Sequence, residues 1–297
     1  MIKKLIIPAA GQKIILLFSA IKELHIKNIW NINNINEISG TSAGAIIALL
    51  LALKIDLQII EDYFIERPWN KFFPKFNQLI NNILSSGIFD KSYCYKFFDP
   101  LFKLQNIDLN ITLKEFYDLN KIKLNIYVTN LNEFIYQRFS YKNFPNLSLI
   151  DAIYMSSTLP LLCQPLKYNN ITYIDGGFFK HDSIENLNDI NNDETLIFTF
   201  KNIQNISDFN NISTINLITN IITNTVNLLN KETENMYCKN QIIIITDSKC
   251  YDIYSWFEFF NNEISRKYHV KLGKIYANIF ITRNKLNSEI SQLYLNH

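Results

Sequence analysis

The stretch that most constrains the fold is NEISGTSAGAIIALLLAL, residues 36–53, in which a serine has a glycine two residues away on each side. A short apolar run precedes this G-x-S-x-G pattern and a longer apolar run follows it. The pattern is typical of a nucleophile elbow, a tight turn from a buried strand into a helix that lifts the serine hydroxyl above the sheet. Small residues that pack at an ordinary strand–helix turn give the same letters, so the flanking strand and helix are part of the evidence.

Apolar periodicity predicts strands that alternate with helices along the rest of the chain. We expect strands at residues 3–8, 35–39, 124–131, 134–140, 196–200 and 241–246, and a hairpin over 167–175 that turns at Asn169-Asn170. Helices are expected from about Ile14 and over residues 43–54, 56–66, 77–84, 90–102, 112–119, 147–157, 212–237 and 255–282. This alternation favours a three-layer α/β architecture with a mainly parallel central sheet. We find no linker or repeat, so we predict a single domain over residues 1–297.

The charge distribution and the apolar runs exclude several classes of protein. The net charge is +2 and no block of like charges occurs, whereas nucleic-acid-binding proteins concentrate their basic residues. No apolar run approaches the roughly 20 residues that a spanning helix needs, and the N-terminal run is broken at Pro8 and too short for a signal peptide. We therefore expect a cytoplasmic location with peripheral contact to membranes.

The cysteines have neither the spacing of a metal site nor that of a paired scaffold. We expect them to be free thiols, and we expect neither a metal ion nor another cofactor. The four residues are Cys94, Cys163, Cys238 and Cys250.

Glycine is rare, with seven residues in the chain, and five of the seven fall in three short stretches. Such clustering indicates backbone positions that only glycine can occupy. The five are Gly11, Gly40, Gly44, Gly176 and Gly177.

A serine nucleophile needs a base. In α/β-hydrolases the serine follows several strands and is paired with a histidine, but here Ser42 follows only about two strands. None of the four histidines, His25, His181, His269 and His297, stands in a context that marks a base. A better candidate is Asp175 in YIDGGFF, where an apolar strand ends at two glycines. A plain β-turn that begins with aspartate is the alternative for this segment.

Four stretches together resemble the patatin-like phospholipase family. The family pattern is a glycine-rich loop, G-x-S-x-G, Ser-Ser/Ala-x-x-Pro and D-G-G/A, and this chain has AAGQK, GTSAG, SSTLPLLCQP and DGG in the same order. The segments VTNLNEFIYQRFS and SGIFDKS also resemble family segments. The resemblance covers about residues 3–185, and the last third carries no match.

The resemblance implies a lipid acyl hydrolase with a Ser–Asp dyad that cleaves phospholipids or related glycerolipids. Ser42 would be the acyl nucleophile, and Asp175 the base that later activates water. The family pattern also implies an oxyanion hole at Gly11, Gln12, Lys13 and Ala43. It assigns the two turns to the motif glycines Gly40, Gly44, Gly176 and Gly177.

The oxyanion loop departs from the family pattern G-G-G-x-K/R-G, because it reads Ala9, Ala10, Gly11, Gln12, Lys13, Ile14. An alanine in a left-handed position would strain the loop by roughly 1–2 kcal/mol. Losing one oxyanion donor lowers turnover about 10²–10³-fold. After DGG, His181 and Ser183 replace the family's asparagine and proline. The alternative hypothesis is therefore a catalytically impaired patatin-fold protein that acts as a lipid-binding or regulatory protein. A histidine-dependent esterase is a third hypothesis.

Two segments interleave aromatic and charged residues, as interfacial membrane anchors do. They are WNKFFPKF, residues 69–76, and SWFEFF, residues 255–260. Aromatic residues packed in the core beneath charged neighbours would give the same pattern. The expected partners are a phospholipid or other acyl-lipid substrate and a membrane surface, and no oligomeric state is indicated.

Overall fold

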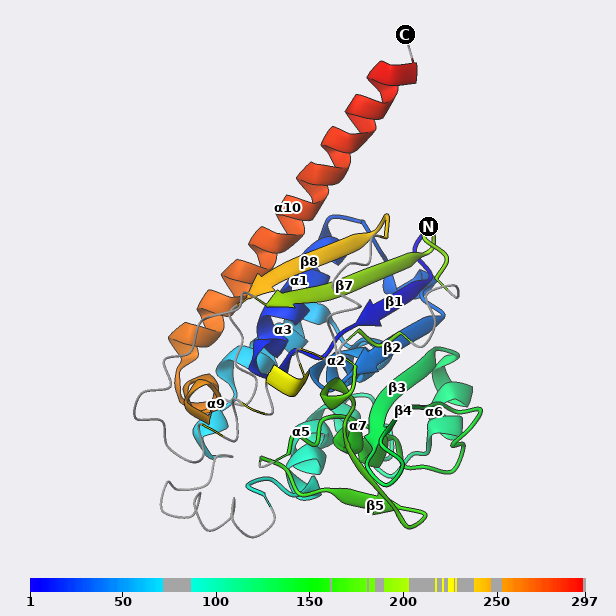
Figure 1. The fold of residues 1–297 in the computed structure, drawn as a ribbon, viewed down its shortest axis with the longest axis vertical. Coiled ribbons are helices and arrows are strands. Elements are labelled where there is room, and N and C mark those ends of the chain that lie inside the picture. Colours follow the sequence, from blue (N-terminus) through cyan, green and yellow to red (C-terminus); the bar gives the residue numbers. More distant parts are fainter. Residues whose placement is uncertain are drawn as a thin grey trace.

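The computed structural model describes residues 1–71, 87–160, 162–180, 182–184, 190–202, 217, 221, 224–226, 228, 238–246 and 253–295. Its strands form one central sheet (Figure 1). They are β1 (Lys4–Ile7), β2 (Glu37–Thr41), β3 (Lys123–Asn130), β4 (Ile135–Phe139), β5 (Leu166–Tyr168), β6 (Ile171–Asp175), β7 (Thr195–Asn202) and β8 (Gln241–Thr246). Hydrogen-bonded neighbours follow the path β5-β6-β3-β2-β1-β7-β8, and β4 also pairs with β3.

The sheet is mainly parallel, as the sequence predicted. β1 pairs in parallel with β2 and β7, and two further parallel pairs are β2 with β3 and β7 with β8. The antiparallel pairs all lie at the β3 end of the sheet. Leu5 and Ile7 of β1 belong to the main core, whereas Ile6 of the same strand packs with Ile184 and Ile197 in a separate cluster. Both faces of β1 are therefore covered, which is typical of parallel strands in a layered α/β protein.

Two strands, β2 and β6, pair with the same edge of β3, and this arrangement brings their last residues together. The last residue of β2, Thr41, lies opposite Tyr127 of β3. The last residue of β6, Asp175, lies opposite Val128, the next residue along β3. Because β4 occupies the other edge of β3 over this region, β2 and β6 must abut end to end on the same edge. The ends of two strands that are 134 positions apart in sequence numbering therefore meet.

Most helices begin and end close to the predicted positions, but the helix predicted over residues 255–282 is divided into two at Asn262, and the second extends to Leu295. The helices are α1 (Ile14–Ile26), α2 (Ala43–Ala52), α3 (Leu57–Glu66), α5 (Lys91–Leu104), α6 (Leu113–Asn120), α7 (Leu149–Ser156), α9 (Ile253–Asn261) and α10 (Glu263–Leu295), with short 3-10 turns η1 (Gly11–Lys13), η2 (Ile32–Asn34), η3 (Trp69–Lys71) and η4 (Gly176–Phe178). The capping box of Thr112 and Glu115 at the start of α6 and the hairpin turn at Asn169 and Asn170 are both confirmed. The predicted helices over 77–84 and most of 212–237 lie outside the described residues.

The C-terminal helix α10 packs along α1, so the part of the sequence without a motif match still covers the core (Figure 1). α1 is buried almost all round, as expected for a helix that is apolar on every side. Ser19 of α1 donates a hydrogen bond of 2.8 Å to the carbonyl oxygen of Val270 in α10. Gly273 is the point of closest approach, because a Cβ there would collide with the carbonyl oxygen of Leu16. The single-domain prediction stays a prediction.

Among the described aromatic residues of the two segments that resemble interfacial anchors, Trp69 is buried, and Trp256, Phe259 and Phe260 are half-buried. Trp69 is 4% exposed, and its ring lies 5.7 Å from Phe97 and 6.2 Å from Phe259. Phe260 packs 5.8 Å from Phe89. The core-packing alternative therefore holds for these residues, because α9 closes over η3, while Phe257 remains exposed and residues 72–76 lie outside the described part of the chain.

The close crossing of α1 and α10 predicts an unusual sign for a helix substitution. Gly→Ala stabilises an open helix by up to about 1 kcal/mol. At Gly273 we expect the opposite, a loss of about 1–3 kcal/mol in the free energy of unfolding, because the added methyl overpacks the contact. Urea denaturation measures the change, with Asn278→Ala on the exposed side of α10 as the matched control. A more stable Gly273→Ala variant would mean that α10 does not pack on α1 in this way.

Candidate active site

The G-x-S-x-G stretch forms a sharp turn between β2 and α2, with Ser42 at its apex. The backbone of Ser42 has φ 55° and ψ −124°, a region that costs a non-glycine residue about 1–3 kcal/mol. A Cβ at Gly44 would collide with the carbonyl oxygens of Ile7 and Pro8, at the end of β1. Only glycine allows α2 to start this close to β1, which is the arrangement that a nucleophile elbow requires. Gly40, the other elbow glycine, has no room for a Cβ against the backbone of Gly44.

Ser42 and Asp175 are hydrogen-bonded to each other. The Ser42 hydroxyl donates to Asp175 Oδ2 at 2.5 Å. The other carboxylate oxygen, Oδ1, accepts the N–H of Gly177 at 2.7 Å within η4. Ser42 is 4% and Asp175 1% exposed. The two strand ends on the edge of β3 therefore bring the predicted nucleophile and the predicted base into direct contact.

Burial raises the pKa of Asp175 from its ordinary value near 3.8 to about 7. The hydrogen bonds from Ser42 and Gly177 oppose this rise, because they stabilise the carboxylate. A carboxylate that titrates near neutral pH is a stronger base than an exposed one, which suits it to accept a proton from a serine hydroxyl.

Three polar residues that hold the dyad in place received no role in the sequence analysis. Ser156 Oγ accepts the N–H of Ser42 at 2.9 Å and donates to the carbonyl oxygen of Tyr127 at 2.6 Å. The carbonyl oxygen of Thr158 accepts the N–H of Asp175, and the Thr129 hydroxyl donates to the carbonyl oxygen of Asp175, both at 2.9 Å. Ser156 and Thr158 lie at the start of SSTLPLLCQP, and the family resemblance of that segment was the available signal.

The loop before α1 is not strained at its alanines, which corrects the expectation from the sequence. Gly11 is the residue with positive φ, at 50°, whereas Ala10 has φ −138°. Among the described residues with positive φ, neither Ala9 nor Ala10 occurs. The left-handed position is thus filled by glycine, and the cost of alanine in such a position does not arise here.

The predicted oxyanion residues lie in two neighbouring elements. Gly11, Gln12 and Lys13 form η1, with Gly11 and Gln12 buried. Ala43 is the first residue of α2, where the N–H groups of a helix have no partner within the helix. A Cβ at Gly177 would lie 2.8 Å from the Cβ of Ala9. The loop, the elbow and the aspartate turn therefore converge on one another.

Ser183, which stands at the family's proline position, joins the elbow strand to β1. Its hydroxyl donates to the carbonyl oxygen of Ile7 and is hydrogen-bonded to the Thr41 hydroxyl, both at 2.7 Å. Since Thr41 immediately precedes Ser42, this departure from the family pattern adds a tether at the elbow. His181 lies outside the described residues.

The described histidines do not take the place of the base. His25 packs against Trp30 at the far end of α1, with ring centroids 4.9 Å apart. In α10, Nδ1 of His269 is 2.9 Å from the carbonyl oxygen of Ser265. The hydrogen-bond acceptor of the Ser42 hydroxyl is a carboxylate, so the geometry does not favour the histidine-dependent hypothesis.

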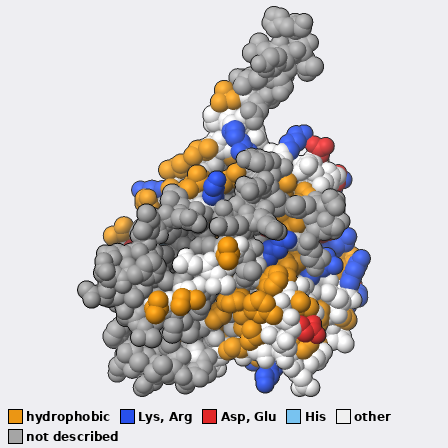
Figure 2. Space-filling model, in the orientation of Figure 1, with side chains coloured by type: hydrophobic (Ala, Val, Ile, Leu, Met, Phe, Trp, Pro, Cys, Tyr) orange, Lys and Arg blue, Asp and Glu red, His pale blue; other side chains and the backbone are white. Residues whose placement is uncertain are grey.

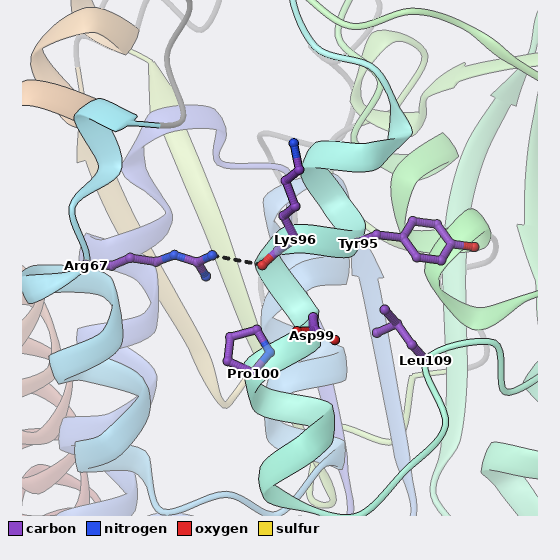
Figure 3. A pocket seen from close by; sticks show the side chains of 6 residues that line it. All are labelled: Arg67, Tyr95, Lys96, Asp99, Pro100 and Leu109. Atoms are coloured by element: carbon purple, nitrogen blue, oxygen red, sulfur yellow. Dashed lines mark hydrogen bonds between the residues drawn. The ribbon is translucent and has the colours of Figure 1, made fainter.

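A surface concavity of about 490 Å³ lies beside α5, and it shares no residue with the predicted site (Figure 3). Its lining residues are Arg67, Tyr95, Lys96, Asp99, Pro100 and Leu109. Pro100 has no N–H to donate to the carbonyl oxygen of Lys96 one turn earlier. Arg67 donates to that oxygen at 2.8 Å and to the carbonyl oxygen of Phe97 at 3.2 Å. The Arg67 guanidinium thus supplies the hydrogen bond that the Pro100 nitrogen cannot donate within α5, which gives Arg67 a structural role.

The hydrogen bonds of Ser156 predict that two adjacent serines differ sharply in importance. Ser156→Ala leaves the Ser42 N–H without its acceptor at a buried, strained turn, which costs about 1–3 kcal/mol. Ser157→Ala is the matched control, because the Ser157 hydroxyl bonds back to the carbonyl oxygens of Ile153 and Tyr154 in the preceding helix α7. We expect Ser156→Ala to lower the thermal unfolding midpoint and Ser157→Ala to change it little. Equal effects would show that Ser156 does not support the elbow.

Several known proteins are similar to this chain. The probable lipid hydrolase 463L of Invertebrate iridescent virus 6 is 25% identical over 195 residues, which make up 62% of this chain and 62% of that protein. The match thus spans less than two thirds of that relative's length. The crystal structure of VipD from Legionella pneumophila has a TM-score of 0.56 at 18% identity, over 95% of this chain and 67% of that chain. ExoU of Pseudomonas aeruginosa, in complex with SpcU, gives a TM-score of 0.42 at 13% identity, over 92% and 52%.

The likeness to VipD concerns the fold, and the family assignment rests on the sequence itself. The sequence model of the family described as patatin-like phospholipase matches residues 5–185, which is more than half of the chain. That range includes every residue of the predicted site. The chain therefore belongs to the patatin-like phospholipase family.

Proposed function

We propose that this protein is a lipid acyl hydrolase that cleaves ester-linked fatty acyl chains from phospholipids or related glycerolipids through a covalent acyl-serine intermediate. The observation that supports this most strongly is the buried hydrogen bond between Ser42 and Asp175 at the apex of the elbow. Family membership and the lipid hydrolase named among its relatives support the lipid substrate class.

In the proposed first step, Ser42 Oγ attacks the ester carbonyl carbon while its proton moves to Asp175 Oδ2. The oxyanion that develops on the carbonyl oxygen is stabilised by the N–H of Ala43 and by the N–H groups of the Gly11–Gln12 region. The positive end of the α2 dipole acts in the same direction. Collapse of the intermediate breaks the ester bond, and the leaving alkoxide takes the proton from Asp175.

In the proposed second step, Asp175 removes a proton from a water molecule, and the resulting hydroxide attacks the acyl-serine. The fatty acid leaves, and Ser42 regains its proton from Asp175. One group serves as base and acid in both halves, which requires a carboxyl that exchanges its proton near the working pH. The raised pKa of Asp175, about 7, supports this double use.

Release of fatty acid from mixed glycerolipid vesicles tests the proposal. We expect Ser42→Ala and Asp175→Asn each to lower the rate by at least about 10³-fold, the usual scale for loss of a nucleophile or its base. Ser157→Ala and the exposed Asp108→Asn are matched controls, because each removes the same kind of group outside the dyad. The alternative, a lipid-binding or regulatory protein, predicts that the wild type binds vesicles without release and that Asp175→Asn changes nothing.

The raised pKa of Asp175 also predicts a pH-dependent cost in stability. A carboxyl whose folded pKa lies above its unfolded value near 3.8 stabilises the fold at low pH, and this contribution is lost as the pH rises to about 7. The asparagine side chain of Asp175→Asn cannot ionise. The free energy of unfolding of this variant, relative to that of the wild type, should therefore rise between pH 4 and 7 by up to about 1.4 kcal/mol per pH unit. Above pH 7 the difference should level off. Urea denaturation across this range measures it, and a difference that does not change with pH would contradict the buried, neutral carboxyl.

A further inference from the structure

The turn between β3 and β4 exposes a group of large apolar side chains. It lies at the same end of the sheet as Ser42, the C-terminal end of β2 and β3. Leu131 is 43%, Phe134 46% and Ile135 44% exposed. We call these three residues the hairpin tip. On the face shown in Figure 2, hydrophobic side chains gather over the region where Figure 1 places β3, β4 and α7. Exposed apolar groups of this kind mark contact sites for membranes or partners.

The position of the hairpin tip follows from the sheet. β2 and β3 are parallel, so the end of β3 and the elbow that follows β2 both lie at the C-terminal end of these strands. Asp175 lies opposite Val128, and Leu131 is three residues further along. At about 3.3 Å per residue, the tip stands about 10 Å beyond the base, toward solvent.

A row of aromatic rings connects the hairpin tip with the candidate active site. The Phe134 ring lies 6.0 Å from Phe178, the last residue of η4, and 5.8 Å from Phe179, which follows it. Phe179 stacks on Tyr136, whose hydroxyl is 3.1 Å from the Thr41 hydroxyl, one residue before the nucleophile. The tip is therefore continuous with the residues that flank the dyad on both sides.

The hairpin tip is held in a fixed and costly conformation. Phe134 has φ 54°, which is a genuine outlier for an aromatic residue. The side chain of Asn130 holds the turn by accepting the N–H groups of Asn132 and Glu133, at 3.1 and 3.2 Å. Asn132 Oδ1 in turn accepts the N–H of Thr172 in β6, at 2.8 Å. A strained turn that is nevertheless braced, and that exposes an aromatic ring, is a candidate for function.

We propose that the hairpin tip, Leu131, Phe134 and Ile135, is the surface by which this protein inserts into a lipid bilayer, so that the dyad faces its substrate. This inference rests on the proposed function for its substrate class. Protein–protein interfaces bury about 800 Å² on each partner, whereas the hairpin tip offers three half-exposed side chains on a narrow turn. Shallow insertion among lipid head groups needs only such a small apolar projection.

The charges indicate a zwitterionic or neutral lipid surface. Among residues 131–135 the one ionisable side chain is that of Glu133, which an anionic surface would repel. The chain as a whole carries a net charge of only +2. Docking through the hairpin tip should therefore depend on apolar contact and change little with salt, unlike the attraction of basic segments to anionic lipids.

Sedimentation with sucrose-loaded phosphatidylcholine vesicles tests the proposal in a Ser42→Ala background, in which the vesicles stay intact. The double variant Phe134→Ser/Ile135→Ser should partition about tenfold less than its parent, because it removes most of the apolar area that insertion would bury. The matched control is Ile26→Ser/Leu119→Ser, which changes two residues that are 54% and 60% exposed. They lie at the C-terminal ends of α1 and α6, which precede the starts of β2 and β3. This control should bind like the parent, and raising the salt concentration should have little effect.

Three results would overturn the docking surface. They are no vesicle binding by the parent, equal binding by the hairpin-tip variant, and an equal loss in the matched control. Phe134→Trp gives a second readout that does not depend on loss of function. Brominated phosphatidylcholine should quench the added fluorescence of Phe134→Trp but not that of Leu119→Trp, and equal quenching of the two would also contradict the proposal.

The same vesicles separate this inference from the proposed hydrolase activity. A wild-type chain that docks through the hairpin tip but releases no fatty acid would contradict the hydrolase and support the docking surface. Fatty-acid release that is unaffected by Phe134→Ser/Ile135→Ser would support the hydrolase and overturn the docking surface.

Discussion

The edge of β3 carries the constraint on which the rest of the structure depends. β2 and β6 abut along this edge, and their last residues lie opposite consecutive residues of β3, Tyr127 and Val128. Any change of one residue in either register would turn a side chain to the other face of the sheet. The contact between Ser42 and Asp175 is therefore a property of strand pairing, with the hydrogen bonds of Ser156, Thr158 and Thr129 fixing the final geometry.

The candidate active site stores several unfavourable features that the surrounding fold must offset. Ser42 has a strained backbone, and Asp175 is buried with no cation among the groups that shift its pKa. Elements packed closely around the site provide the compensation. β1 contacts the elbow at Gly44, and α10 seals the outer side of α1 at Gly273. The C-terminal third, which carries no motif, thus contributes to the rigidity that a strained active site needs.

The motif-bearing parts of the fold could be predicted because their patterns are local. The strand–turn–helix around Ser42, the capping box at Thr112 and the turn at Asn169 and Asn170 each depend on a few neighbouring residues, and the structure has them at the predicted positions. The family resemblance marked the segment that contains Ser156, but its hydrogen bond to the elbow could not be predicted, because α7 must reach a turn more than 100 residues earlier. For the same reason the sequence left the two aromatic segments open between membrane anchors and core packing, since α9, which covers Trp69, lies far along the chain. The strain expected at Ala9 and Ala10 was wrong because the left-handed position falls on Gly11.

The central claim is that Ser42 is activated by a carboxyl whose pKa lies near 7. Its most direct test is the rate at which a fluorophosphonate probe reacts with the protein between pH 5 and 9, with the modified peptide identified by mass spectrometry. The structure predicts one adduct, on Ser42, formed at a rate that rises with a midpoint near pH 7 as Asp175 loses its proton. An adduct on another residue, or a rate on Ser42 that does not change across this range, would contradict it.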